Sequence, residues 1–178
     1  RGVKPGPLGH VNLDNTDQGA AFGPGERELA EILAEHAAIA IENALLHRKS
    51  TQDRVTDVYN HSAFQQFLDD EVERARQGGY TCGLLMIDVD DFKLINDTLG
   101  HPMGDVVLSE FCGAIKETLR PPDFFSRFGG DEFALLLPET DLPGAVAVAE
   151  RVLQKLRAWN IHDTEEGSIR CSASIGIA

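Results

Sequence analysis

The chain has 178 residues, which is enough for one large domain or for one domain with a fragment of another. Its formal net charge of −13 argues against duplex nucleic acid as a partner, because neutralising phosphates requires a basic face. A small phosphorylated ligand stays compatible with this charge if a metal ion supplies local positive charge. The most apolar helical stretch, residues 37–46, contains Glu42 and Asn43 and is too short to cross a bilayer, so we expect no membrane span.

The start of the chain and its cysteines indicate a cytoplasmic protein. Residues 1–9 lack the apolar segment that signal peptides carry, and the absence of a first Met leads us to expect further sequence upstream. The cysteines, Cys82, Cys112 and Cys171, cannot form a full disulfide framework and lie among apolar or small residues. We therefore expect buried free thiols in a reducing cytosol.

A long helix is predicted near the start of the chain. Residues 1–22 are rich in Gly, Pro, Asn and Asp and contain one candidate strand, Leu8–Leu13. The helix begins after them, with Gly23 as N-cap and Pro24 in the first turn. Apolar residues then recur at spacings of three and four as far as about Lys49. Such a stripe needs an apolar partner, either another helix or the chain's own N-terminal fragment, and the sequence favours neither.

The rest of the chain alternates between strands and helices. Residues 49–60 are polar and without period, as expected of a hinge, and a helix over 62–77 ends at Gly78-Gly79. The predicted elements that follow are a strand over 81–88, a helix over 105–119, strands over 124–128 and 133–137, a helix over 142–159 and a strand over 168–178. Gly129-Gly130-Asp131 between the middle strands is a hairpin signal. This β-α-β-β-α-β order predicts an α+β fold of the ferredoxin-like or palm type, an antiparallel sheet with helices on one face.

This strand order brings acidic residues together at one edge of the sheet. The first strand is central and antiparallel to the strand beginning at Phe133, so Asp88 lies beside Asp131 and Glu132. Asp90 is close by, but side chains alternate along a strand, and Asp88 with Asp131 is the favoured pair. Clustered carboxylates repel one another unless they bind a cation, and oxygen ligands suit Mg²⁺ completed by substrate phosphates. A solvated acidic turn is the less favoured alternative, because two acidic turns are predicted to meet.

Two neighbouring features have both a plain and a functional interpretation. Lys93 follows the first strand and is able to steady a phosphate charge, although a Lys at such a position is more often solvent-facing. Gly129 and Gly130 serve the hairpin, and bare glycines also let a nucleotide approach the backbone closely.

Four sequence blocks resemble those of one family. Residues 129–133 spell GGDEF, and residues 88–97 (DVDDFKLIND) resemble the D-x-D-x-F-K-x-x-N-D block of GGDEF domains. Residues 100–105 (GHPMGD) are similar to the family's G-H-x-x-G-D block, and residues 174–178 (SIGIA) to its S-I-G-[VI]-A strand. Their order and spacing make a chance match negligible. Residues 51–178 therefore resemble the GGDEF family of diguanylate cyclases.

The resemblance implies an enzyme that joins two GTP molecules into cyclic di-GMP and releases two pyrophosphates. It would depend on Mg²⁺, with Mn²⁺ as an alternative, held by Asp88, Asp131 and the carbonyl of Val89 against the GTP phosphates. Asp131 would also deprotonate or orient the ribose 3′-hydroxyl, and Glu132 is a second candidate for contact with the metal. Because each domain binds one GTP, two domains must face each other, and a homodimer is expected.

Further substrate contacts are implied by the same resemblance. Asn96 and Asp105 would read the guanine edge, where a carboxylate suits the N1–H and N2–H₂ donors. The remaining contacts are expected near the phosphates or the base, from Phe92, Lys93, His101, Gly129 and Gly130.

A second ligand site is implied by Arg120-Pro121-Pro122-Asp123, which matches the family's R-x-x-D product-inhibition motif. Without the family, an Arg followed by Pro-Pro at the end of a helix is simply a stop signal. With the family, Arg120 and Asp123 are expected to bind inhibitory cyclic di-GMP, and Arg contacts to guanine and phosphate are chemically suited to that role.

Residues 1–50 resemble, more loosely, the closing segment of a GAF domain followed by a signalling helix. Residues 8–15 (LGHVNLDN) are similar to the last strand of such a domain and residues 38–44 (AIAIENA) to its final helix. A GAF ligand pocket needs more than this segment, so we infer no ligand. The helix is expected to set the relative orientation of two cyclase domains.

Two features depart from the family pattern. In the block over residues 53–61, Asp57 stands where the family has Gly, and His61 where it has Arg. The chain also stops at Ala178, before the family's Y-x-A-K block, whose Lys contacts phosphates, so we expect that the domain is truncated at its C-terminal end. If Ala178 is the true terminus, we expect weaker binding of the phosphates. Two further hypotheses are therefore kept: a catalytically silent module that binds GTP or cyclic di-GMP, and a structural dimerisation element.

Overall fold

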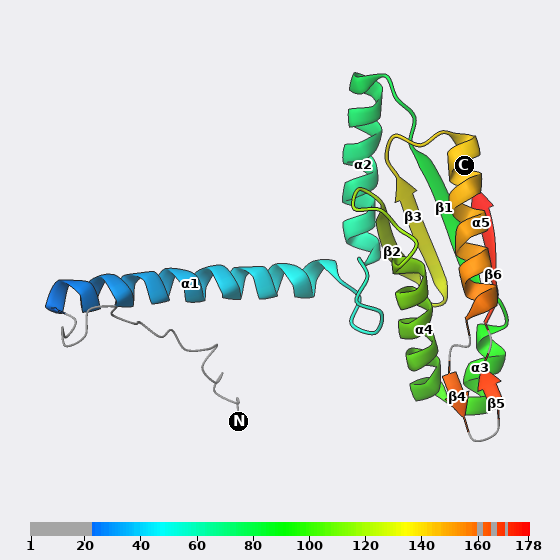
Figure 1. Cartoon of the computed structure of the whole chain (residues 1–178), viewed down its shortest axis with the longest axis horizontal. Coiled ribbons are helices and arrows are strands. Elements are labelled where there is room, and N and C mark those ends of the chain that lie inside the picture. The colour runs from blue at the N-terminus through cyan, green and yellow to red at the C-terminus, as the bar shows by residue number, and fades with distance from the viewer. Residues whose placement is uncertain (1–22, 160–161, 165–166, 170) are drawn as a thin grey trace. The chain divides into compact units, whose positions relative to one another are not determined.

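The computed structural model describes residues 23–159, 162–164, 167–169 and 171–178 (Figure 1). The chain divides into two units, Arg1–Ser50 and Thr51–Ala178. The predicted strand Leu8–Leu13 lies outside the described residues. Among the described helices, none has the length and apolar character needed to span a membrane.

Helix α1, Pro24–Thr51, begins where the sequence predicts and runs slightly beyond Lys49. The Glu26 carboxylate accepts a hydrogen bond from the Gly23 N–H at 2.7 Å, which suits the positive end of the helix dipole. No residue of α1 is buried in the described structure. Leu33 is 59% exposed and Ile41 is 48% exposed, so the apolar stripe lies open to solvent.

The second unit is built on a four-stranded antiparallel sheet of order β2-β3-β1-β6. Its strands are β1 (Gly83–Val89), β2 (Phe124–Gly129), β3 (Glu132–Leu137) and β6 (Ala173–Ile177). The predicted ferredoxin-like order is therefore confirmed. The predicted last strand over 168–178 was wrong at its start, because β4 (His162–Thr164) and β5 (Gly167–Ile169) pair with each other as a separate hairpin.

Helices pack on both faces of this sheet, so the prediction of helices on one face was incomplete. Helices α4 (His101–Lys116) and α5 (Leu142–Ala158) enclose the main core with Phe133, Leu135 and Leu137 of β3. Helix α2 (His61–Gly78) covers the opposite face, where Phe64 packs with Ala134 and Leu136 (Figure 1). The physical reason is the alternation of side chains along β3, which is apolar at every position from Phe133 to Leu137 and so has two faces to bury.

The helices after the first strand differ from the prediction in number and in where they begin. Helix α3 (Phe92–Leu99) follows β1, and α4 begins at His101 instead of Asp105. Gly100, at φ 83°, separates the two helices in a backbone conformation that favours glycine. In the predicted hinge over residues 49–60, the two ends of the loop are joined by a hydrogen bond, which the Asn60 N–H donates to the Thr51 carbonyl at 2.8 Å.

Both ends of α2 follow the capping signals in the sequence. The Asn60 side chain accepts a hydrogen bond from the Ala63 N–H at 3.0 Å, and Gly79 at φ 68° ends the helix. Local capping signals therefore determine where this helix begins and ends.

The cysteines agree with the predicted free thiols except in one respect. Cys112 and Cys171 are free and buried, and burial raises the pKa of each thiol to about 12. Cys82 is free but only half-buried, because it packs at the margin of the smaller cluster beneath α2.

Candidate functional site

The end of β1 lies beside the turn between β2 and β3. Asp88 pairs in register with Glu132, and Val89 N–H donates to the Asp131 carbonyl at 3.2 Å. The structure thus brings the predicted acidic residues to one edge of the sheet. Gly130, at φ 52°, permits the tight turn that places Asp131 there.

The carboxylates at this edge differ in their surroundings. Desolvation, the nearby Asp131 carboxylate and Asp90 raise the pKa of Asp88 above its usual range. Hydrogen bonds from the Ser172 hydroxyl at 2.6 Å and the Ser174 hydroxyl at 2.7 Å lower the pKa of Asp90. Asp90 is therefore held by β6 and the residues before it, while Asp88 and Asp131 repel each other across the edge.

This edge fits a magnesium-type ion and does not form a complete protein cage. Within the described residues no group of three or more His, Cys, Asp and Glu side chains is positioned to hold a metal. Mg²⁺ needs only one or two carboxylates, because waters and substrate phosphates complete its octahedron. The pKa of Asp88 is raised by desolvation and then by repulsion from Asp131 and Asp90, and a cation would offset both effects.

A cavity of about 440 Å³ adjoins the edge, between α3, α4 and the turn. Its lining includes most residues predicted to contact substrate, together with Asp131: Phe92, Lys93, Asn96, His101, Asp105 and Gly130. Asp97, Leu108 and Arg127 also line it and were not predicted. Asp88 and Glu132 line a second cavity of about 330 Å³, and Gly129 and Val89 lie next to these walls without lining either.

Asn96 and Gly104 form the tightest contact of the larger cavity. The Asn96 Oδ1 atom is buried and has no hydrogen-bond partner within the described part of the chain. A Cβ atom at Gly104 would fall on that oxygen and would lie 3.2 Å from Phe92 Cζ. Glycine is thus required at Gly104 to leave room for the Asn96 amide.

Arg127 ties the acidic turn to the loop that follows α1. Its Nε donates to the Gly130 carbonyl at 2.8 Å, and its Nη1 donates to Asp53 Oδ1 at 3.0 Å. Burial opposes ionisation of Asp53, but hydrogen bonds from the Thr56 hydroxyl and N–H, and then Arg127, outweigh it and lower the pKa of Asp53. The sequence signal for Arg127 was a lone Arg inside an otherwise largely apolar strand.

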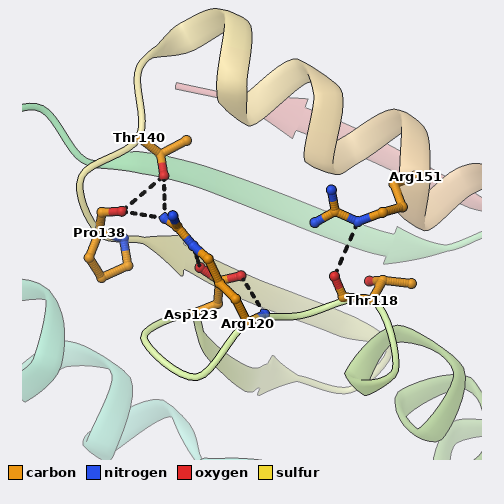
Figure 2. A network of polar contacts seen from close by, with 6 residues as sticks. All are labelled: Thr118, Arg120, Asp123, Pro138, Thr140 and Arg151. Atoms are coloured by element: carbon orange, nitrogen blue, oxygen red, sulfur yellow. Dashed lines mark hydrogen bonds and ion pairs between the residues drawn. The ribbon is translucent and has the colours of Figure 1, made fainter.

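A second cluster surrounds Arg120 at the other end of β3 (Figure 2). Arg120 Nε donates to Asp123 Oδ1 at 2.8 Å, and its Nη2 donates to Thr140 Oγ1 at 2.7 Å and to the Pro138 carbonyl. A cavity of about 900 Å³ lies beside it, lined by Arg120 and by Arg151 of α5, whose Nε donates to the Thr118 carbonyl at 3.1 Å. Asp123 does not line this cavity and instead orients Arg120.

Residues 50–178 match the family described as "Diguanylate cyclase, GGDEF domain", and the chain belongs to this family. Among curated proteins, it is 40% identical over 129 residues to diguanylate cyclase DgcP of Pseudomonas aeruginosa, covering 72% of this chain and 19% of that protein. It is 37% identical over 161 residues to diguanylate cyclase A of Treponema denticola, covering 88% and 43%. The chain thus spans less than half the length of these relatives.

Solved structures give the same family. The diguanylate cyclase SiaD from Pseudomonas aeruginosa, in complex with its activator SiaC, matches with TM-score 0.71 and 36% identity over 85% of this chain and 58% of that one. The coiled coil and GGDEF domain of DgcB from Caulobacter crescentus, in complex with c-di-GMP, matches with TM-score 0.76 and 28% identity over 87% and 82%.

Two glycines of α4 offer a matched test of the Asn96 contact. Gly113→Ala is expected to stabilise the chain by about 0.5–1 kcal/mol, because helix propensity rises and no atom lies within 4 Å of the new Cβ. Gly104→Ala should instead destabilise it, since the new methyl displaces the Asn96 amide. Urea unfolding of both variants measures the difference, and equal stabilisation would contradict the contact.

Asp53→Asn is expected to lower the free energy of unfolding by about 1–2 kcal/mol at neutral pH, because it removes a charged hydrogen-bond acceptor. The folded pKa of Asp53 is lowered from 3.8, so its contribution is present above that value and is lost as pH falls through the folded pKa. Urea unfolding at pH 7 and near pH 3 should show the wild-type advantage shrinking in acid. Asp69→Asn, on the exposed face of α2, is the control and should show no such advantage.

Proposed function

We propose that this chain is a diguanylate cyclase that condenses two GTP molecules into cyclic di-GMP with release of two pyrophosphates. The observation that carries the proposal is the Asp88–Asp131 edge beside a cavity lined by Asn96 and Asp105. An acidic edge next to a polar cavity suits a nucleoside triphosphate whose phosphates bring a metal with them. We place this activity in the cytoplasm, where GTP and reduced thiols are found.

The acidic edge would supply the catalytic groups. Asp88, Asp131 and the Val89 carbonyl would hold Mg²⁺ or Mn²⁺, with Glu132 as a further candidate; the ion supplies charge stabilisation for the developing phosphoryl charge. Asp131 would orient the ribose 3′-hydroxyl or accept its proton. The 3′-oxygen then bonds to the α-phosphorus of the second GTP, and the bond to pyrophosphate breaks in line.

The cavity of about 440 Å³ between α3, α4 and the turn would select the base. Asn96 and Asp105 both line it; the Asn96 amide would hydrogen-bond to the guanine edge, and the Asp105 carboxylate would accept from the N1–H and N2–H₂ pair. Lys93 and the backbone at Phe92 would lie near the phosphates, with His101 near the base. A Cβ atom added at Gly129 or Gly130 would meet no atom within 4 Å, so the turn is open to a nucleotide.

Asp131→Asn is expected to lower cyclic di-GMP formation at least about 100-fold, because it removes a metal ligand and proton acceptor from the edge. Chromatography of product from GTP and Mg²⁺ measures the rate for wild type, for Asp131→Asn and for the exposed control Glu150→Gln. No product from a dimeric wild-type sample would refute the cyclase. A Mg²⁺-dependent rise in melting temperature with GTP, without product, would support the silent binding module instead.

The Arg120 cavity would bind the product and inhibit the enzyme. Asp123 and Thr140 fix the Arg120 guanidinium, and Arg151 brings a second guanidinium to the same cavity, so two cations face a ligand with two phosphates. Figure 2 shows Arg120 on the segment before β2 and Arg151 on α5.

Arg120→Ala is expected to relieve product inhibition at least about tenfold, because the guanidinium that holds phosphate or guanine is lost. The measurement is the concentration of added cyclic di-GMP that halves GTP turnover. Arg157→Ala, an exposed change on α5, is the matched control. Equal inhibition of wild type and Arg120→Ala would refute this inhibitory site.

Activity would require two copies, because the reaction joins two bound GTP molecules. The exposed stripe of α1 is the proposed means of pairing them. Leu33→Lys with Ile41→Lys is expected to abolish dimers and product formation together, since charges replace apolar contacts. Light scattering and the product assay test this, with Glu31→Lys as control; retained dimers in the double variant would contradict it.

A further inference from the structure

We propose that Tyr80 forms an aromatic wall of the Arg120–Arg151 cavity against which a guanine base of cyclic di-GMP stacks; this rests on the inhibitory site proposed above. Tyr80 lines that cavity together with both guanidinium-bearing residues. None of the sequence motifs includes Tyr80, and the acidic edge does not use it.

The backbone of Tyr80 is fixed by the end of α2. Gly79, at φ 68°, ends the helix in the left-handed conformation, and its N–H donates to the Ala75 carbonyl. Tyr80 N–H donates to the same carbonyl at 3.2 Å. This helix-ending motif determines where the aromatic side chain leaves the backbone.

The far end of the Tyr80 ring is also held. Its hydroxyl donates to Glu71 Oε1 at 3.2 Å, and Glu71 is only 1% exposed. Arg74 Nη2 lies 3.0 Å from Glu71 Oε2, so the buried carboxylate is paired with a cation as well. Desolvation and Glu71 raise the pKa of Tyr80 above its usual value.

One edge of the ring, the Cδ1–Cε1 bond, lies against the last turn of α2. A Cβ atom at Gly78 would lie 2.6 Å from Tyr80 Cε1 and 2.7 Å from Cδ1, so the ring packs directly on the glycine backbone. The aromatic ring is therefore restrained by its backbone, its hydroxyl and the Gly78 contact. A pre-positioned ring loses little conformational entropy when a ligand stacks on it.

The other lining groups suit the remaining parts of a guanine nucleotide. Arg120 and Arg151 provide cations for phosphates, and the Glu139 and Asp141 side chains provide acceptors of the type that guanine N–H donors need. An aromatic surface supplies the base-stacking contact that neither of these charged sets provides. The cavity thus carries a complementary group for each chemical part of the ligand.

Tyr80→Leu and Tyr80→Phe separate stacking from simple filling of space. Leu keeps apolar cover over Gly78 but has no aromatic face, so cyclic di-GMP binding measured by calorimetry should weaken at least about tenfold. Phe keeps the ring and loses only the Glu71 hydrogen bond, so binding should stay within about threefold of wild type. Thermal melting of each variant establishes that it is folded.

Cyclic di-GMP binding by wild type, Arg120→Ala and Tyr80→Leu distinguishes failure of the inhibitory site from failure of Tyr80 stacking. If wild type and Arg120→Ala bind cyclic di-GMP equally, the inhibitory site is refuted, and the role of Tyr80 with it. If Arg120→Ala loses binding while folded Tyr80→Leu keeps it, only the stacking role is overturned.

A measurement on the unmodified chain covers the case in which Tyr80→Leu does not fold. The chain has two tyrosines, Tyr59 and Tyr80, so their ring proton resonances can be told apart by comparison with Tyr80→Phe. Stacking predicts upfield ring-current shifts of the Tyr80 protons on addition of cyclic di-GMP, with Tyr59 unchanged. Unmoved Tyr80 resonances at saturating ligand would overturn the proposal.

Discussion

The antiparallel pairing of β1 with β3 is the constraint on which the rest of the structure depends. Its register sets Asp88 opposite Glu132 and brings Val89 N–H to the Asp131 carbonyl. A shift of one residue would turn Phe133 and Leu135 from the main core to the face covered by α2, and it would displace the acidic edge with them. The hydrophobic core therefore fixes the position of charged groups that make no hydrophobic contact themselves.

Local signals in the sequence were sufficient for most of the fold and for much of the candidate site. The hairpin at Gly130, the end of α2 at Gly79 and the apolar strands that follow one another along the chain each depend on a few neighbouring residues. All of them appear in the structure. The clustering of Asn96, His101 and Asp105 was accessible through the family resemblance, because their blocks flank one short turn between two helices.

What escaped prediction depends on contacts between distant segments. Arg127 joins Asp53 to Gly130, and a single Arg in a strand carries no signal about which carboxylate it will meet. Arg151 likewise lines the cavity beside Arg120 only because α5 packs beside the segment that holds Thr118. The packing of α2 on the second face followed from an apolar run in β3, a pattern compatible with burial on one face or on two.

The cavity lined by Asp131 and the cavity lined by Arg120 lie at opposite ends of strand β3. Asp131 precedes β3 and Pro138 follows it, so six residues, or roughly 20 Å of extended chain, separate the groups that would hold the substrate from those around Arg120. A ligand bound at Arg120 would therefore not overlap with a ligand bound at Asn96 of the same domain. Product bound at Arg120, as proposed above, would accordingly inhibit without competing with GTP: added substrate would not reverse the inhibition, and output would be set by accumulated product even when GTP is abundant.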